Sequence, residues 1–373
     1  MKKVKLGEVC EILSGYAFKS SQFNDNKIGL PLIRIRDVER GFSDTYFEGT
    51  YSEEYLIKNG DLLITMDGSF ILKKWEGDLA LLNQRVCKIK ITDKSVDEGY
   101  ISWLIPKFLK EIEDKTPFVT VKHLSVAKIK DISFVLPNKL EQKLIAKKLN
   151  TISQIYDFRK IQSEKFNELV KSRFNEMFEE YPDSVFLDTY IKELRAGKSL
   201  AGEENNKNKV LKTGAVSYDY FNSSEVKNLP IDYIPLDEHK VEIGDVIISR
   251  MNTSELVGAA GYVWAINSDN IYLPDRLWKV ILNDRVNPVF LWKLITNEKT
   301  KLKIKRISSG TSGSMKNISK SQLLQIRVPF PPLALQNEFA DFVAQVDKSQ
   351  LAIQKSLEEL ETLKKSLMQE YFS

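Results

Sequence analysis

Histidine and cysteine are scarce in this chain of 373 residues, which contains two of each. The two histidines, His123 and His239, are too few for a histidine-rich metal site or a zinc motif built on paired histidines. The two cysteines, Cys10 and Cys87, lack CxxC spacing, which excludes a disulfide framework and a cysteine-rich zinc site and fits a reducing cytosol. We therefore expect neither a secreted disulfide scaffold nor a metal centre.

Long apolar runs are also absent. Nowhere do 18 apolar residues follow one another, and the N-terminal stretch MKKVKLGEVCEIL contains no apolar run of signal-peptide length. We therefore expect a cytoplasmic protein that makes no membrane contact. With 42% hydrophobic residues the chain can bury real cores, and its length favours two or three domains over one.

The familiar catalytic motifs are missing as well. The sequence has no phosphate-binding P-loop, no GxGxxG between a strand and a helix, and no aromatic-proline tetrapeptide of the kind that adenine methyltransferases use. The triplets EDK (113–115) and EVK (225–227) have the composition of a nuclease motif but lack a properly spaced Pro-Asp before them. We predict no catalytic residues and no metal ligands in this chain.

What the sequence does contain is a long internal repeat. The stretch KHLSVAKIKDISFVLPNKLEQKLIAKKL (122–149) aligns without a gap with KNISKSQLLQIRVPFPPLALQNEFADFV (316–343), and Gln142 matches Gln336. Upstream, IKNGDLLITMDGS (57–69) matches VEIGDVIISRMNT (241–253). A period near 190 residues indicates a duplicated domain and not a solenoid.

Turn and periodicity signals predict mixed α/β globes. The runs GDLLIT, GDVIIS, VCKIKI and LWKVIL read as strands, IRIRDV (33–38) as a polar strand, and 100–112 and 289–304 as helices. After each repeated proline, from 140 to 180 and from 333 onward, an apolar ladder with heptad spacing predicts a long helix. The expected helix-pairing seam is Leu149, Ile152, Tyr156, Phe166, Val170, Met177, Val343, Val346, Ile353, Leu357, Leu360, Leu367 and Tyr371.

Two arrangements of these helices are open. The two apolar stripes can pack against each other as an antiparallel handle between two globes, which we favour. Alternatively, each helix can pack on its own globe or on another protein.

The charge of the chain permits a nucleic-acid partner without requiring one, since the formal net charge is +4. Between residues 299 and 337, eight basic residues occur with no acidic residue, around the small, hydroxylated stretch SSGTSGSMKN (308–317). Such a segment is suited to phosphate contacts, although a solvated lysine-rich face has the same composition.

The two copies differ most directly after the GDLLIT and GDVIIS strands, where MDGSF stands against RMNTSELVG. One scaffold with two different exposed tips is expected to bind two different targets of one kind, such as two unlike half-sites along a DNA duplex. The candidate DNA-binding residues are Arg34, Arg36, Asp67, Ser69, Arg85, Lys122, Lys212, Arg250, Asn252, Thr253, Arg276, Ser312, Lys316 and Asn317.

These motifs, in this order and twice over, resemble the DNA-specificity subunit of type I restriction–modification enzymes. The resemblance rests on VKLGEVCEILSGYAFKS, the GDLLITM and GDVIISR strands, TVKHLSVAKIKDISFVLP, IRVPFPPLALQNEF and LEELETLKKSLMQEYF, and spans nearly the whole chain. It implies an α+β fold in which two tandem mixed α/β target-recognition domains are separated by two long α-helices that form an antiparallel coiled coil with pseudo-twofold symmetry. The expected domains are residues 1–138 and 181–332 for recognition, with helices over 139–180 and 333–373.

The resemblance further implies that each domain reads one half of a bipartite, asymmetric site in double-stranded DNA. The helices would set the spacer and dock two methyltransferase subunits, and restriction/translocation subunits would join them. The chain itself would bind no cofactor: S-adenosylmethionine would belong to the methyltransferase, and ATP and Mg to the motor subunit. The alternative is a coiled-coil scaffold whose globular domains bind protein or polysaccharide.

Overall fold

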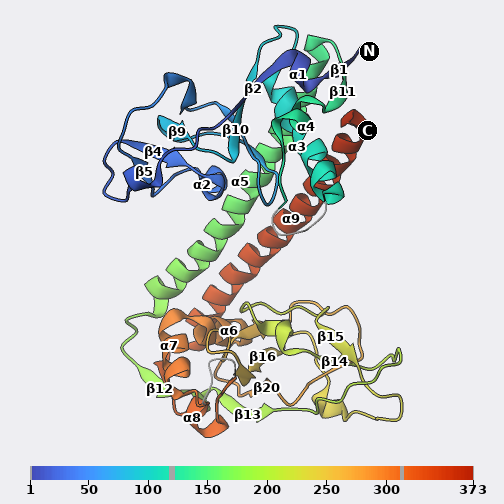
Figure 1. Cartoon of the computed structure of the whole chain (residues 1–373). Helices are drawn as coiled ribbons and strands as arrows, with labels where there is room; N and C mark the ends of the chain where they lie inside the picture. The colour runs from blue at the N-terminus through green and yellow to red at the C-terminus, as the bar shows by residue number, and fades with distance from the viewer. Residues whose placement is uncertain (1, 117–121, 311–314, 373) are drawn as a thin grey trace. The chain divides into compact units, whose positions relative to one another are not determined.

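Two compact units make up the computed structural model, which describes residues 2–116, 122–310 and 315–372. The first unit combines the chain up to residue 158 with the chain from residue 357, and the second unit covers 159–356. Each contains a mixed α/β globe and one stretch of each of two long helices, α5 (Lys139–Phe178) and α9 (Leu333–Phe372), drawn green and red in Figure 1. The predicted combination of mixed globes and two long helices is confirmed.

The first globe is rich in short strands. Its strands are β1 (Lys2–Lys5), β2 (Cys10–Ser14), β3 (Phe23–Asn24), β4 (Leu30–Ile33), β5 (Tyr46–Phe47), β6 (Leu56–Ile57), β7 (Leu62–Thr65), β8 (Leu72–Lys74), β9 (Ala80–Leu82), β10 (Val86–Ile91) and β11 (Ser133–Leu136). Its helices are α1 (Leu6–Val9), α2 (Ile35–Arg40), α3 (Glu98–Lys115) and α4 (Val126–Lys130).

The second globe has a parallel inventory. Its strands are β12 (Ser184–Phe186), β13 (Ile191–Arg195), β14 (Lys209–Leu211), β15 (Val226–Asn228), β16 (Val246–Ser249), β17 (Met251–Asn252), β18 (Ala260–Tyr262), β19 (Ile271–Tyr272), β20 (Leu277–Leu282), β21 (Lys316–Asn317) and β22 (Arg327–Pro329). Its helices are α6 (Pro288–Thr296), α7 (Glu298–Ile307) and α8 (Lys320–Leu324).

The duplication predicted from the sequence is present in the strand order. The central sheet of the first globe runs β2-β10-β7-β8 and that of the second β13-β20-β16-β18, both with antiparallel neighbours. A two-stranded sheet joins β1 to β11 in one globe and β12 to β22 in the other. Even the parallel pairs correspond, β4 with β9 and β14 with β19. The two globes are therefore copies of one topology.

The repeated Gly-Asp pair has a physical explanation in a tight turn before the central strand. Gly60 and Gly244 adopt φ values of +98° and +97°, a left-handed conformation that favours glycine. The carboxylates of Asp61 and Asp245 each accept the backbone N–H three residues earlier, at 2.9 and 2.8 Å. Asp245 also pairs with the mostly buried Lys279 of β20 at 2.9 Å, which ties the turn to the sheet.

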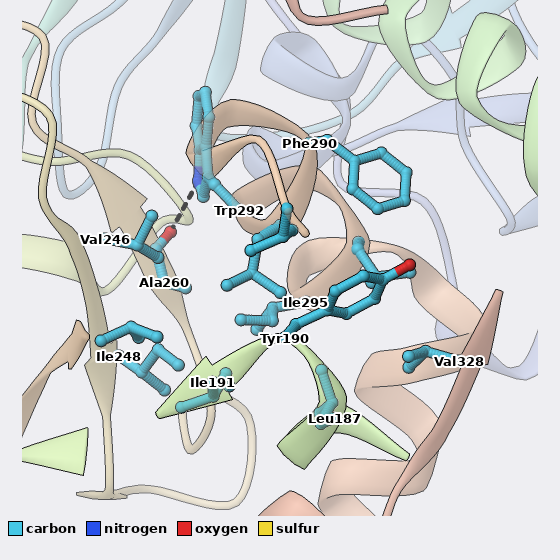
Figure 2. Close-up of a cluster of buried hydrophobic side chains, with 14 of the residues drawn as sticks. Leu187, Tyr190, Ile191, Val246, Ile248, Ala260, Phe290, Trp292, Ile295 and Val328 are labelled. Atoms are coloured by element: carbon cyan, nitrogen blue, oxygen red, sulfur yellow. Dashed lines mark hydrogen bonds between the residues drawn. The ribbon is translucent and has the colours of Figure 1, made fainter. Parts of the chain in front are cut away.

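Aromatic and aliphatic side chains from helices and strands fill the core of the second globe (Figure 2). Tyr190, Phe290 and Trp292 are buried there beside Val246 and Ile248 of the central strand β16. The Trp292 indole N–H donates to the Ala260 carbonyl at 3.0 Å, the dashed line in Figure 2. Its single polar atom is thereby paired inside an apolar environment.

The long helices run antiparallel within each unit. In the first unit Lys148 lies 3.1 Å from the hydroxyl of Tyr371, and Tyr156 donates to Glu361 at 3.4 Å. In the second, Gln350 donates to Asn167 at 2.8 Å and Arg173 pairs with Glu338 at 3.1 Å. Residues later in α5 therefore contact residues earlier in α9 within each unit, as antiparallel helices do. Every residue of the predicted seam is buried or half-buried.

Within each unit the long helices pack on the globe as well as on each other. Phe178 of α5 meets Phe290 of the second globe with ring centroids 4.9 Å apart, and lies 5.4 Å from Phe339 of α9. In the first unit Phe372 of α9 packs against Tyr100 at 5.5 Å.

A buried glutamine fixes the start of each long helix on its globe. The Gln142 side chain accepts the backbone N–H of Asp97 at 2.8 Å and donates to the carbonyls of Ser95 and Pro137. Gln336 makes the same three bonds in the second unit, accepting from Asn287 at 2.9 Å and donating to two carbonyls. Asp97 and Asn287 cap α3 and α6, so each glutamine joins two helices. These shared hydrogen bonds explain why both copies of the repeat contain a glutamine at this position.

Two secondary-structure predictions are wrong. The helix expected over 289–304 is interrupted at Asn297, whose ψ of 142° ends α6 and whose side chain caps α7 by accepting from Lys299 at 3.0 Å. The polar strand expected over 33–38 ends at Ile33. Helix α2 follows, because the Asp37 carboxylate accepts the N–H of Arg34 at 3.0 Å and closes the first turn.

In the portions of the chain that the structure describes, the helices are too short or too polar to cross a membrane.

Candidate nucleic-acid interface

Three segments distant in the sequence meet at one edge of the first globe: the residues after β7, the turn before β10, and the residues before α4. Backbone hydrogen bonds hold them together. Met66 donates to the carbonyl of Arg85 at 2.8 Å and accepts from Leu124 at 2.7 Å, while Gly68 donates to Lys122 at 3.0 Å. The candidates Asp67, Arg85 and Lys122 are thereby brought into one site.

The corresponding segments of the second globe meet in the same way. Arg250 donates to the carbonyl of Arg276 and accepts from Ile318, both at 3.0 Å. Strand β17 then pairs with β21, so that Asn252 faces Lys316 and Met251 faces Asn317 across the ladder. The structure thus brings together five of the candidates from this half: Arg250, Asn252, Arg276, Lys316 and Asn317. The two sites share a backbone framework.

In the first unit the site is centred on a carboxylate that contacts two other side chains. Asp67 forms an ion pair with Arg85, whose Nε lies 3.3 Å from the carboxylate, and lies 2.6 Å from His123 Nδ1. The side chains of Arg85 and His123 are about half exposed, at 52% and 49%, whereas Asp67 is only 20% exposed. Arg85 has a φ of +74°, which is rare outside glycine and marks a constrained turn. The carboxylate therefore orients two outward-facing hydrogen-bonding groups.

In the second unit the same backbone framework carries other polar side chains, and of Arg250, Asn252 and Asn317 only the last stands at the position of a first-unit site residue, His123. The Arg250 guanidinium lies 3.4 Å from Asn317 Oδ1, and its carbon is 5.6 Å from the ring centroid of the buried Trp278. The Asn252 side chain accepts the N–H of Thr253 at 2.9 Å. Arginine and asparagine can each make two parallel hydrogen bonds to a base edge, to guanine and adenine respectively. This arrangement favours direct reading of bases.

Some candidates point elsewhere or are engaged with other segments. Lys122 directs its amine to the carbonyl of Glu113 at 2.7 Å, and Lys316 directs its amine to that of Gly310 at 2.8 Å. Ser69 is exposed, and its carbonyl accepts the Thr65 hydroxyl.

Three further candidates lie at the start of a helical turn, Arg34 and Arg36 in the first globe and Lys212 in the second. Arg34 donates to the Thr45 hydroxyl, Arg36 pairs with the buried Asp37 at 3.6 Å, and Lys212 pairs with Glu225 at 3.9 Å. No contact with the three converging segments is seen for these three among the described residues. Ser312 lies outside the described residues.

Several lysines of the basic run 299–337 form ion pairs with acidic residues elsewhere in the chain. Lys299 pairs with Glu179 at 2.6 Å, Lys305 pairs with Glu255 at 2.9 Å, and Lys301 pairs with Asp219. Acidic residues distant in the sequence thus neutralise part of it. These three lysines are therefore held in ion pairs within the chain.

Two residues of these sites, His123 and Trp278, were not among the candidates predicted from the sequence. His123 aligns with Asn317 of the second copy, and this match to a candidate is the signal that the sequence offers for it. Trp278 lies inside a predicted strand, and nothing in the pattern shows that it supports Arg250. Within residues 2–116, 122–310 and 315–372, no cluster of three or more histidine, cysteine or acidic side chains is suited to hold a metal ion.

Comparisons with known proteins agree with this duplicated arrangement. The family model described as "Type I restriction modification DNA specificity domain" matches residues 1–167 and 191–363. The EcoBI specificity subunit of Escherichia coli is 41% identical over 169 residues, which are 45% of this chain and 36% of that protein. The EcoKI specificity subunit of E. coli strain K12 is 23% identical over 379 residues, covering 92% of this chain and 82% of that protein. The match to EcoBI therefore spans only about a third of that relative.

Solved structures give the same fold at low sequence identity. The type I restriction-modification S subunit from M. genitalium superposes with a TM-score of 0.64 at 14% identity, covering all of this chain and 96% of that one. A chain from a study of type I R-M complex assembly and conformational transition has a TM-score of 0.54 at 15% identity, covering 100% and 97%. At these identities the likeness shows the fold alone.

Proposed function

The chain belongs to the family of type I restriction–modification DNA specificity domains, and we propose that it is a sequence-specific DNA-binding subunit whose two globes each read one half of a bipartite, asymmetric site. The supporting observation is that one backbone framework carries two different sets of polar side chains. Asp67, Arg85 and His123 occupy it in the first unit, and Arg250, Asn252 and Asn317 in the second. A duplicated backbone framework that carries different polar side chains in its two copies is suited to read two different half-sites along one duplex.

The partners and cofactors follow from the same proposal. The chain docks two methyltransferase subunits, which bind S-adenosylmethionine, and restriction/translocation subunits, which use ATP and Mg, complete the assembly. The paired helices set the length of the unread spacer, and each recognition domain extends over the bounds predicted above. This chain contributes recognition and no catalysis, and it acts in the cytoplasm.

The alternative of a scaffold that binds protein or polysaccharide is less well supported. A scaffold has no need of outward-facing arginine, histidine and asparagine groups fixed on matching frames in both globes. It also does not account for the family to which both halves of the chain belong.

A selection from random duplex DNA tests the proposal. The chain, co-purified with the methyltransferase subunit encoded beside it, is expected to retain duplexes that share two short motifs at a fixed separation. Because phosphate neutralisation releases counterions, the affinity is expected to fall with salt, with a log–log slope of about 0.9 for each phosphate contacted. Retention without any shared motif would contradict the proposal and favour the scaffold.

A further inference from the structure

The central sheet of the second unit places an arginine beside a buried tryptophan. Trp278 of β20 lies directly opposite Ile248 of β16 in the antiparallel ladder, and Arg250 follows Ile248 by two residues. The N–H of Arg250 continues the ladder by donating to the Arg276 carbonyl at 3.0 Å. Since side chains alternate between the faces of a sheet, Arg250 and Trp278 are diagonal neighbours on one face. The guanidinium carbon accordingly lies 5.6 Å from the Trp278 ring centroid.

Tryptophan is an unfavourable residue for this position if only the core is considered. Trp278 is 1% exposed, and among the described residues its indole N–H has no hydrogen-bond partner. A buried donor without a partner destabilises the fold, and a phenylalanine would avoid this cost. The tryptophan ring, however, attracts a cation better than any other aromatic side chain. The residue at position 278 therefore suits the adjacent arginine better than it suits the core.

A second contact restricts the orientation of the Arg250 side chain. Its Nε lies 3.4 Å from Asn317 Oδ1, and Arg250 is half-buried. The Asn317 backbone is fixed in turn, because it exchanges two hydrogen bonds with Ser309, at 2.8 and 2.9 Å. Within the described residues, the two terminal nitrogens of the guanidinium make no hydrogen bond or ion pair. These nitrogens are therefore available to a ligand while the rest of the side chain is held.

The first unit has no such pair at the matching positions. Along GDLLITM and GDVIISR, Met66 occupies the place of Arg250. Along LNQRVCKI and LPDRLWKV, Cys87 occupies the place of Trp278. Both Met66 and Cys87 are buried and uncharged. The arginine–tryptophan pair is thus a difference between the two copies and not a part of the shared scaffold.

We propose that Arg250 reads a guanine in the half-site of the second unit, and that Trp278 is the positioning residue for this contact. The inference rests on the proposed DNA-reading function and adds the identity of one base. Guanine presents two acceptors, O6 and N7, on its major-groove edge, and a guanidinium can donate to both at once. Adenine carries an amine in place of O6 and opposes one of these donors. Because Trp278 and Asn317 already restrict the guanidinium, less side-chain freedom is lost on binding.

Competition binding tests the inference on the full chain, co-purified with its methyltransferase subunit. The duplex selected from random DNA competes with duplexes that carry each other base at every position in turn. Arg250→Ala identifies the position that Arg250 reads, and we expect a guanine there. Trp278→Leu is expected to reduce the preference for this guanine by about 2- to 5-fold through loss of the cation–π contact, and Trp278→Phe by less. Preferences at all other positions should stay unchanged.

A double variant separates positioning from a general loss of structure. In an Arg250→Ala chain, which has no guanidinium to position, adding Trp278→Leu should leave the base preferences as they are. The inference would be overturned by a base other than guanine at the Arg250 position, or by an Arg250→Ala chain that loses no base preference. An unchanged guanine preference in Trp278→Leu, or an equal loss at every position of the half-site, would also overturn it. A chain that selects no motif at all would instead contradict the proposed function, and this inference with it.

Discussion

Replacing Gln336 by leucine is expected to lower the free energy of unfolding by at least ~3 kcal/mol, because it leaves three backbone groups without partners. The side chain of Gln336 is fully buried and serves the N–H of Asn287 and the carbonyls of Arg285 and Pro331. Leucine supplies apolar volume but none of these bonds, and each unpaired buried group costs about 1–3 kcal/mol. Urea denaturation followed by circular dichroism measures the change.

The chain supplies two controls for this substitution. Gln142→Leu is expected to cause a loss of similar size, because Gln142 makes the same three bonds in the first unit. Gln345→Leu places the same change at an exposed position on α9 and should alter stability by less than about 0.5 kcal/mol. If Gln336→Leu and Gln345→Leu had equal effects, the glutamine would not anchor the helix to its globe.

Replacing Arg250 by alanine is expected to weaken binding to the cognate duplex by about 5- to 150-fold, the equivalent of ~1–3 kcal/mol for one base contact. Because Arg250 lies in the second unit, the loss of preference should be confined to one base position of one half-site. Competition binding against duplexes with single base changes in each half-site measures this.

Arg306→Ala is the matched control for charge. Arg306 is an exposed residue of the basic run in the same unit, and its loss should weaken binding to all duplexes alike or not at all. If the Arg250 and Arg306 variants lost affinity equally across all base changes, Arg250 would contact only the phosphate backbone.

The sequence predicted well those features that depend on short-range pattern and on the repeat. The strands β7 and β16 follow directly from a Gly-Asp turn and an aliphatic run, and the long helices from heptad spacing. The break at Asn297 was missed because apolar residues continue across it at helical spacing, and a capping side chain overrides that pattern.

Contacts between distant segments could be predicted only in part. Asp67, Arg85 and Lys122 were each candidates, but their meeting depends on how β7, β10 and the approach to α4 lie in the sheet. The setting of Arg34 was not predicted, because a strand was expected where the Asp37 carboxylate begins a helix. The pairing of Lys299 and Lys305 with acids far along the chain likewise has no local signal.

The most direct test of the central claim is a genome-wide map of N6-methyladenine in a methylation-free host. The chain is co-expressed with its neighbouring methyltransferase subunit, first unchanged and then with residues 1–138 exchanged for those of another family member. We predict a methylated motif split by a fixed run of unread bases, and an exchange that changes one half of the motif while the other half stays the same. A motif whose two halves both change, or a co-purifying complex that methylates no motif, would contradict the account.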